Sequence, residues 1–539
     1  MNPSIARISK GVQRRWLQAQ NNRKIASLAA DIERQAPESN SCGPVAFFNA
    51  SSRLAWMSQN AAFTLISSWA LCLAGTPVVH FVCHAGMTRC QLGTNRLNAD
   101  EPPPCVVCMA QSKHLYPAAK TAWFDFKLDS ELEHAIRGFS LAELMAFEWQ
   151  GLPLGELVLP SLRWALRRHH LLENPDTLYF FRQYLLSAWN VAVEFTRFLN
   201  DRQPQGVVVF NGIAFPEAVA RRLAQLRGLW VVTHEVGLQP FTAYFTHGQA
   251  TAYPIDIPPG YRLTEAQNER LNRYLTERMK GNFTMAGIRF WPEMAGLSAE
   301  FLKKAAGFKQ IVPVFTNVIF DTSQSHANVI FPHMFAWLDE VATLIRNHPK
   351  TLFVIRAHPD EERPGKAADE SVAGWVEKNR ISELPNVVFV NSSEYLSSYE
   401  LIQRSKFVLV YNSTIGLEAS ILGVPVLCGG KARFTQIPTV FLPGSAEEFH
   451  QIAEKMIKAN QIEVPTEFQQ NARTFLYYQL YKTSLPFGHL LEADITPGFV
   501  RFKNDVHWQD FQASESDSIA ALVDGILHNG SFLLPNGDD

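Results

Sequence analysis

The sequence has little cysteine and almost no net charge. Seven cysteines in 539 residues are too few for a disulfide scaffold, and they fit a reducing compartment. A formal charge of -2 supplies no broad basic field, so we expect no nucleic acid partner. Because 47% of the residues are hydrophobic and 19% are charged, the chain is a packed globular protein, long enough for two large domains or more.

Several signatures of common enzyme classes are also missing. No G-x-G-x-x-G motif follows a predicted strand, which disfavours a dinucleotide-dependent redox enzyme. There is no G-x-x-x-x-G-K-[ST] loop and no G-x-S-x-G elbow, which argues against a P-loop NTPase and an α/β-hydrolase. A D-x-D frame for a divalent metal is absent too, so a bound nucleotide would have its phosphates neutralised by helix N-termini and side chains.

The first 24 residues are basic and lack the apolar core of a signal peptide. We expect a helix that either contacts anionic lipid or is solvated. The uncharged segment Leu54–Val79 is interrupted by Gly75-Thr76-Pro77, which predicts a buried helix, a turn and a strand rather than a membrane span. The expected location is the cytoplasm, with peripheral contact at the inner face of the cell membrane left open. The basic residues are Arg7, Lys10, Arg14, Arg15, Arg23 and Lys24.

Short apolar strands alternate with helices in two separate regions, a pattern typical of parallel sheets. The sequence therefore predicts an α/β fold with two Rossmann-like, doubly wound parallel-sheet domains that face each other across a cleft. We expect a basic helical segment at 1–40, a first domain at 41–290 with a Cys-rich insertion at 83–108, a second domain at 291–468, and a helical or irregular extension at 469–539. The predicted strands are 45–49, 78–83, 206–210, 229–233, 311–316, 352–356, 386–390, 407–411 and 424–428; the predicted helices include 54–73, 216–226, 333–347, 371–378, 395–404 and 415–422.

Two strands of the second region end in polar motifs. Strand 352–356 runs into His358-Pro359, and strand 407–411 runs into Ser413-Thr414 at the start of a helix. Since ligands bind at the carboxyl ends of parallel strands, these motifs favour a phosphate and nucleotide site, with Glu418 one turn later placed to grip ribose hydroxyls. Taken singly, each motif is also an ordinary helix cap or strand end.

The pair R-x-H-P and S-T-x-G-x-E-A…G-x-P-V resembles the nucleotide-binding half of GT-B glycosyltransferases of bacterial capsule and surface polysaccharide synthesis, a group that includes CMP-Kdo and sialic acid transferases. The resemblance covers roughly residues 310–485, and the first domain only in architecture. It implies that the second domain binds a nucleotide-sugar donor and that the first receives the acceptor. His358, Ser413, Thr414 and Glu418 would contact the donor, and Thr316, Asn317 and Arg356 would approach its phosphates, with Arg356 alternatively turned inward.

The resemblance also implies a general base after strand 229–232 of the first domain, where the sequence reads Thr-His-Glu-Val-Gly. Glu235 would take the proton from the acceptor hydroxyl, with His234 standing where many relatives have a second acid. A purely structural cap or ion pair at Glu235 is the alternative.

A group of four cysteines stands apart from these motifs. Cys83 and Cys90 precede Cys105-Val-Val-Cys108 in one irregular stretch. Four thiolates with this spacing can close a tetrahedral zinc site; an iron–sulfur cluster and simple buried thiols are the alternatives.

The sequence thus predicts a glycosyltransferase that moves a sugar from a nucleotide donor, CMP favoured and UDP open, to a hydroxyl of a surface polysaccharide or glycolipid. We expect this enzyme to need no cofactor for catalysis. Two alternatives remain: a nucleotide-sugar epimerase or hydrolase of the same fold, and a non-catalytic assembly factor that binds a glycan or a nucleotide.

Overall fold

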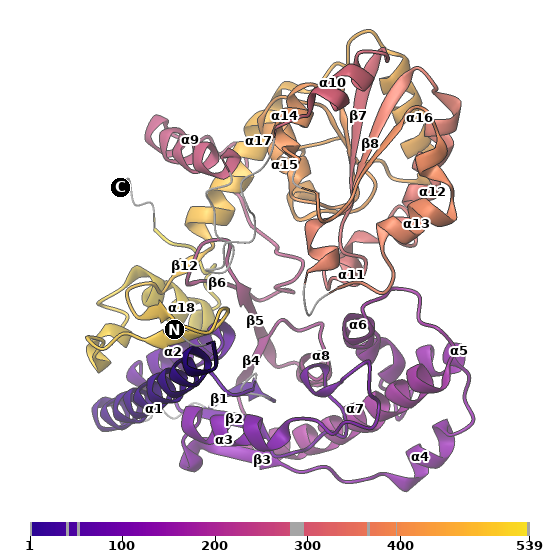
Figure 1. The fold of residues 1–539 in the computed structure, drawn as a ribbon. Helices are drawn as coiled ribbons and strands as arrows, with labels where there is room; N and C mark the ends of the chain where they lie inside the picture. Colours follow the sequence, from indigo (N-terminus) through magenta and orange to yellow (C-terminus); the bar gives the residue numbers. More distant parts are fainter. Residues whose placement is uncertain are drawn as a thin grey trace.

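The computed structural model describes residues 3–38, 43–50, 54–280, 296–363, 367–394 and 396–535, and side chains from residue 11 onward. The side chains of Arg7 and Lys10 in the basic segment, and Tyr395 at the start of the predicted helix 395–404, lie outside the described residues. Two α/β domains stack on each other, each around its own parallel sheet (Figure 1). The predicted fold class is confirmed.

The sheet of the first domain has seven strands in the order β12-β6-β5-β4-β1-β2-β3. Its central parallel strands β1, β2 and β4 bury nearly all their side chains, as a sheet covered on both faces requires, whereas the edge strand β3 buries only one of its four. The strands are β1 Val45–Asn49, β2 Val78–Cys83, β3 Thr121–Phe124, β4 Gly206–Phe210, β5 Trp230–Val236, β6 Thr242–Thr246 and β12 Leu485–Pro486. The last two are antiparallel additions.

The second domain is built on five parallel strands in the order β11-β10-β7-β8-β9. They are β7 Gln310–Phe315, β8 Thr351–Arg356, β9 Val387–Val390, β10 Val408–Val410 and β11 Val426–Cys428. All six side chains of β8 are buried, which explains its continuous apolar sequence. Strands β8 and β10 carry the two polar motifs, and β7 lies between them rather than the two being neighbours.

Helices cover both sheets. In the first domain they are α1 Pro3–Gln35, α2 Gln59–Leu73, α3 Cys105–Leu115, α4 Ser130–Ile136, α5 Leu141–Met145, α6 Leu154–Leu166, α7 Pro175–Arg202, α8 Glu217–Leu226 and α18 Asp517–His528. In the connector and second domain they are α9 Glu265–Met279, α10 Ala299–Ala305, α11 Gln324–Ala327, α12 Met334–Asn347, α13 Val372–Lys378, α14 Ser398–Gln403, α15 Ile415–Ile421, α16 Ala446–Lys458 and α17 Thr466–Tyr477.

The uncharged segment near residue 60 forms the buried helix α2, as predicted. Ser58 caps its N-terminus by accepting a hydrogen bond from the Ala61 N–H at 3.2 Å. Within the described residues, none of the helices combines the length and the apolar character needed to cross a bilayer.

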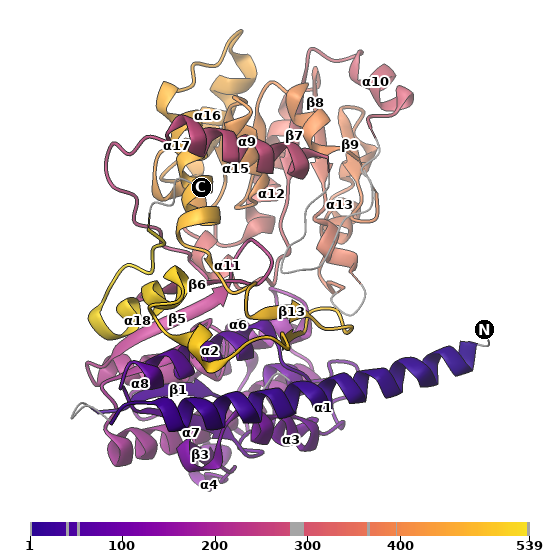
Figure 2. The same cartoon turned by 90° about the vertical axis from the view of Figure 1, so that its left-hand side faces the viewer.

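The C-terminal residues return to the first domain. After α17, which packs against α15, the chain adds β12 to the first sheet and then forms the hairpin of β13 (Leu491–Ala493) and β14 (Val500–Phe502). Apolar side chains from this segment share one core with α1 and α2. The N-terminal end of α1 projects beyond the body of the molecule (Figure 2).

Candidate functional site

His358 follows strand β8 and caps a short 3-10 turn, Pro359–Glu362. Its Nδ1 accepts a hydrogen bond from the Asp360 N–H at 3.2 Å. Burial lowers the pKa of His358, although the nearby Asp360 and Asp321 carboxylates oppose the shift. The ring is therefore neutral near pH 7, and because Nδ1 is an acceptor, its proton sits on Nε2. His358 can donate one hydrogen bond to an anionic or carbonyl oxygen.

The second motif follows strand β10. Ser413 and Thr414 lead into α15, and the Asn317 side-chain oxygen, from the end of β7, accepts a hydrogen bond from the Asn412 N–H at 3.3 Å. Glycine is required at 416, because an added Cβ would come within 2.9 Å of Val410. The turn of helix after Ser413 thus packs closely on the strand that precedes it.

These motifs meet at one open pocket with about 1340 Å³ of empty space. His358, Asn317, Ser413 and Thr414 line it from the carboxyl ends of β7, β8 and β10. The facing wall, Thr251–Pro254, comes from the segment that leaves the first sheet. The convergence of the two motifs, inferred from the sequence, is therefore present at the junction of the domains.

Charges of both signs line this pocket. Lys431 and Arg433 line it from the segment after β11, and the Asp321 and Asp360 carboxylates belong to the same lining. An anionic ligand would contact the two cations.

His326 also lines the pocket. Burial, followed by the charges of Lys431, Arg433 and Arg221, lowers the pKa of His326 to about 4. The His326 ring meets the Thr251 hydroxyl at 2.8 Å, so it joins the domains as a neutral group.

Arg356 and Thr316 do not reach the pocket surface. The Arg356 guanidinium is buried and donates to the Leu396 carbonyl oxygen, and burial lowers its pKa to about 10. The Thr316 hydroxyl donates to the Arg356 carbonyl oxygen at 3.0 Å. Arg356 is thus turned inward, the second of the two orientations expected for it, and both residues fix the ends of β7 and β8.

Glu418 is also placed differently from the expectation. Its Oε1 lies 2.5 Å from Nε of Arg278 in α9, and its Oε2 accepts a hydrogen bond from the Tyr399 hydroxyl at 2.7 Å. Only 4% of Glu418 is exposed, and it is not among the residues that line the pocket. The structure gives this carboxylate a packing role, and its contact with ribose stays a prediction.

In the first domain the sequence predicts that the strand ends at residue 232 and that a loop follows, and this prediction is wrong. Strand β5 continues to Val236 and pairs with β6. The His234 ring is 1% exposed and lies between the rings of Phe210 and Phe245. A base that exchanges a proton with substrate needs access to it, so the structure does not support His234 in catalysis.

Glu235 points to the opposite face of β5, as alternation along a strand requires. Its Oε2 accepts a hydrogen bond from the Asn211 side-chain amide at 2.8 Å, which joins the ends of β4 and β5. Asn211 adopts a positive φ of 61° directly after β4. Glu235 is half-buried, lies close enough to Tyr253 to influence its charge, and is not part of the pocket wall.

Sequence reasoning missed several pocket residues. Lys431 and Arg433 follow the predicted strand 424–428, so they stand at the same sheet edge as the other motifs, and this was a usable signal. No local pattern marks His326 or Thr251, since only the packing of the domains brings them together.

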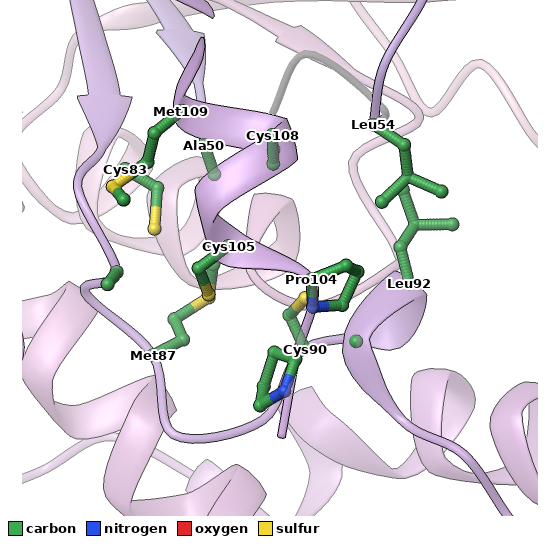
Figure 3. A pocket seen from close by; sticks show the side chains of 13 residues that line it. Ala50, Leu54, Cys83, Met87, Cys90, Leu92, Pro104, Cys105, Cys108 and Met109 are labelled. Atoms are coloured by element: carbon green, nitrogen blue, oxygen red, sulfur yellow. The ribbon is translucent and has the colours of Figure 1, made fainter. Parts of the chain in front are cut away.

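The four predicted zinc ligands, Cys83, Cys90, Cys105 and Cys108, line one small, mostly apolar pocket of the first domain (Figure 3). None of them forms a disulfide, and burial raises the pKa of Cys90 to about 12. As the side chains stand, no group of three or more His, Cys, Asp or Glu in the described part of the chain is arranged to hold a metal ion. Cys72 and Cys428 are buried elsewhere in the two domains.

The fold and the pocket define a two-domain α/β protein with a Rossmann-like sheet in each domain and a polar pocket where the carboxyl ends of the second sheet face the first domain. Residues 301–472 match the model of the family described as "Capsule polysaccharide biosynthesis protein", so the resemblance of the second domain to that family is confirmed. Among curated proteins none matches the sequence.

Solved structures with low identity resemble the chain. One is the KpsC β-Kdo 2,7 transferase of Thermosulfurimonas dismutans, with 14% identity, a TM-score of 0.33, and coverage of 57% of this chain and 85% of that one. The β-Kdo 2,4 transferase of the same organism's KpsC has 11% identity and a TM-score of 0.35, with coverage of 57% and 87%. The UDP-GlcNAc 2-epimerase of Neisseria meningitidis bound to UDP-GlcNAc has 12% identity and a TM-score of 0.24, with coverage of 81% and 98%.

Proposed function

We propose that this protein is a glycosyltransferase that moves a sugar from a nucleotide-activated donor to a hydroxyl of a capsular or surface polysaccharide. The observation that carries the proposal is the shared pocket of His358, Ser413 and Thr414 under Lys431 and Arg433. The family match over residues 301–472 supports it independently.

The donor would lie with its phosphate on the second domain. Lys431 and Arg433 offset the phosphate charge, and the neutral His358 donates from Nε2 to a phosphate or base oxygen. Hydroxyls of Ser413 and Thr414 complete this wall. We propose that these side chains, rather than a divalent metal or another cofactor, neutralise the leaving nucleotide, and that the base is cytosine or uracil, with CMP favoured.

Glu235 is the proposed general base. Its carboxylate is held by the Asn211 amide at the end of the first sheet, on the acceptor side of the junction. It would accept the proton of the acceptor hydroxyl as the oxygen attacks the anomeric carbon, while the C–O bond to the nucleotide phosphate breaks and the nucleotide leaves with that bonding pair. Approach of the domains around the donor would exclude water, which otherwise hydrolyses the activated sugar.

Donor binding and transfer can be measured separately. Calorimetric titration with CMP, UDP and GDP identifies the base, and incubation of labelled CMP- and UDP-sugars with and without a capsule glycan or glycolipid acceptor identifies the reaction. Transfer that requires acceptor and persists in EDTA is expected. Release of sugar without acceptor would instead indicate an epimerase or hydrolase, and binding without turnover would indicate an assembly factor.

Glu235→Gln tests the assignment of the base. The amide keeps the hydrogen-bonding shape but cannot take a proton, so we expect turnover to fall about 100-fold or more while nucleotide affinity is unchanged. Asn211→Ala is the matched control for position, because it leaves the carboxylate but removes the hydrogen bond from the Asn211 amide. Wild-type turnover in Glu235→Gln would remove this residue from the mechanism.

We also propose that the protein works in the cytoplasm at the inner face of the membrane, where a glycolipid acceptor would be presented. Helix α1 carries Arg14, Arg15 and the 58% exposed Trp16 in its N-terminal half. Basic and aromatic side chains together suit an anionic lipid surface. Sedimentation with vesicles containing anionic lipid, compared with neutral vesicles, tests this contact.

A further inference from the structure

The cysteine cavity is built from three separate pieces of chain. Cys83 ends β2, Cys90 lies in the following loop, and Cys105 and Cys108 occupy the first turn of α3 (Figure 3). Residues from a strand, a loop and a helix thus place four thiols around one mostly apolar pocket. Nothing in the proposed transfer reaction uses them.

The first two cysteines begin two separate turns that have the same local sequence pattern. Each begins a C-x-x-G sequence, Cys83 to Gly86 and Cys90 to Gly93. The Gly86 N–H donates to the Cys83 sulfur at 3.1 Å. The Gly93 N–H donates to the Cys90 carbonyl oxygen at 3.0 Å, which closes the second turn. A backbone N–H aimed at sulfur, as at Cys83, stabilises the thiolate, the form in which cysteine binds a metal.

Both glycines are required by close packing. A Cβ at Gly86 would lie 2.2 Å from the Phe124 ring, and a Cβ at Gly93 would lie 2.7 Å from Pro103 and 3.1 Å from the Cys90 sulfur. The backbone of each turn therefore lies so close to its neighbour that no side chain fits at the glycine. A repeated, tightly packed turn around two thiols indicates a built site rather than incidental cysteines.

A positive charge lies beside the cluster. The Arg89 guanidinium donates to the carbonyl oxygens of Thr88 and Ala99, each at 2.8 Å, and its charge lies near Cys105. Four thiolates around a divalent cation leave two negative charges, and a neighbouring arginine offsets one of them.

We propose that Cys83, Cys90, Cys105 and Cys108 bind one zinc ion as a structural site. Zinc takes four thiolates tetrahedrally at about 2.3 Å, and each thiol gives up its proton to solvent as the Zn–S bond forms. In the described residues no three of these groups are within reach of one ion, so the proposal requires the sulfurs to move together when the metal binds.

The site would fix a loop that touches the second domain. Between Cys90 and Cys105, Arg96 forms an ion pair with Asp369 and donates to the Ala367 carbonyl oxygen. The Cys cluster therefore anchors both ends of the segment that carries this contact between the domains. Its metal would stabilise the arrangement of the domains without entering the reaction.

The test is metal analysis of the full-length protein purified without chelator or affinity metal. We expect one zinc per chain by elemental mass spectrometry, released when a thiol-modifying reagent is added. Replacement with cobalt should give the intense visible bands of a tetrahedral ion and a sulfur-to-cobalt charge-transfer band. Protein that stays metal-free after exposure to zinc, cobalt that binds without the charge-transfer band, or stoichiometric iron would each overturn the proposal.

Variants locate the site. Cys105→Ser and Cys108→Ser should reduce the zinc content well below one per chain, and Cys72→Ala, a buried cysteine of α2 in the same domain, should keep it. If a serine variant does not fold, the cobalt spectrum of the wild type still decides, because the charge-transfer band reports thiolate ligation directly. Equal zinc loss in Cys72→Ala would also overturn the assignment.

Discussion

Glu418 is either a structural carboxylate or a ligand of the nucleotide, and the variant Glu418→Gln tells these two roles apart. In the structure one carboxylate oxygen faces Arg278 at 2.5 Å and the other accepts the Tyr399 hydroxyl at 2.7 Å. The Glu418 side chain is 5% exposed and that of Arg278 is 16% exposed. Burial disfavours the charged guanidinium, yet the facing carboxylate raises the pKa of Arg278 above its usual range.

The expected cost follows from this burial. Removing one member of a buried ion pair leaves the other charge without compensation and typically costs about 3–5 kcal/mol. For a domain of this size, about 2–4 °C of unfolding temperature corresponds to each kcal/mol, so Glu418→Gln should lower the midpoint by about 6–20 °C. Arg278→Gln should do the same, because either change breaks the same pair.

Thermal unfolding followed by circular dichroism measures the loss, and calorimetric titration well below the midpoint measures nucleotide affinity. The matched control is Glu383→Gln, which breaks an ion pair with Arg380 whose side chains are 57% and 76% exposed and should leave the midpoint unchanged. If Glu418→Gln unfolds at the wild-type temperature but no longer binds nucleotide, the packing role is refuted and the carboxylate belongs to the ribose.

Two further predictions concern the turn after β8. His358→Ala removes one hydrogen bond to a charged ligand, worth about 1.5–3 kcal/mol, so the Kd for the nucleotide should rise roughly 10- to 150-fold by calorimetry; an unchanged Kd would place the ligand elsewhere. Burial raises the pKa of Glu361 from 4.5 to about 8, against the effect of the hydrogen bond from the Val372 N–H, so the folded protein keeps a proton that the unfolded chain releases. Stability should therefore decrease as the pH rises from about 4.5 to about 8, and Glu361→Gln should flatten that slope in thermal melts at pH 5 and pH 8; an equal slope in the variant would contradict the assignment.

Local pattern alone predicted much of the second domain. The apolar run Leu352–Ile355 had to be a strand buried on both faces, and it is. The polar motifs at His358 and Ser413 had to share one edge, because parallel strands that alternate with helices place all their carboxyl ends together. These conclusions need only residue type, spacing and the direction of the strands.

The first domain shows where that reasoning fails. Thr-His-Glu-Val-Gly reads as a loop, since Glu and Gly are weak strand formers. In the structure β6 pairs with it in antiparallel register and extends β5 to Val236, and the alternation of a strand then sends His234 into the core and Glu235 to the other face. The pairing partner, not the local sequence, decided which of the two can act as a base.

The sequence by itself determined the two-sheet architecture, the edge on which a nucleotide would bind, and the four thiols of one insertion. Only the tertiary structure decided that Glu418 faces an arginine 140 residues away and that His326 meets Thr251 from the other domain. Periodicity reports how a segment meets its neighbours along the chain, whereas such contacts depend on how distant elements pack, and no local pattern encodes that.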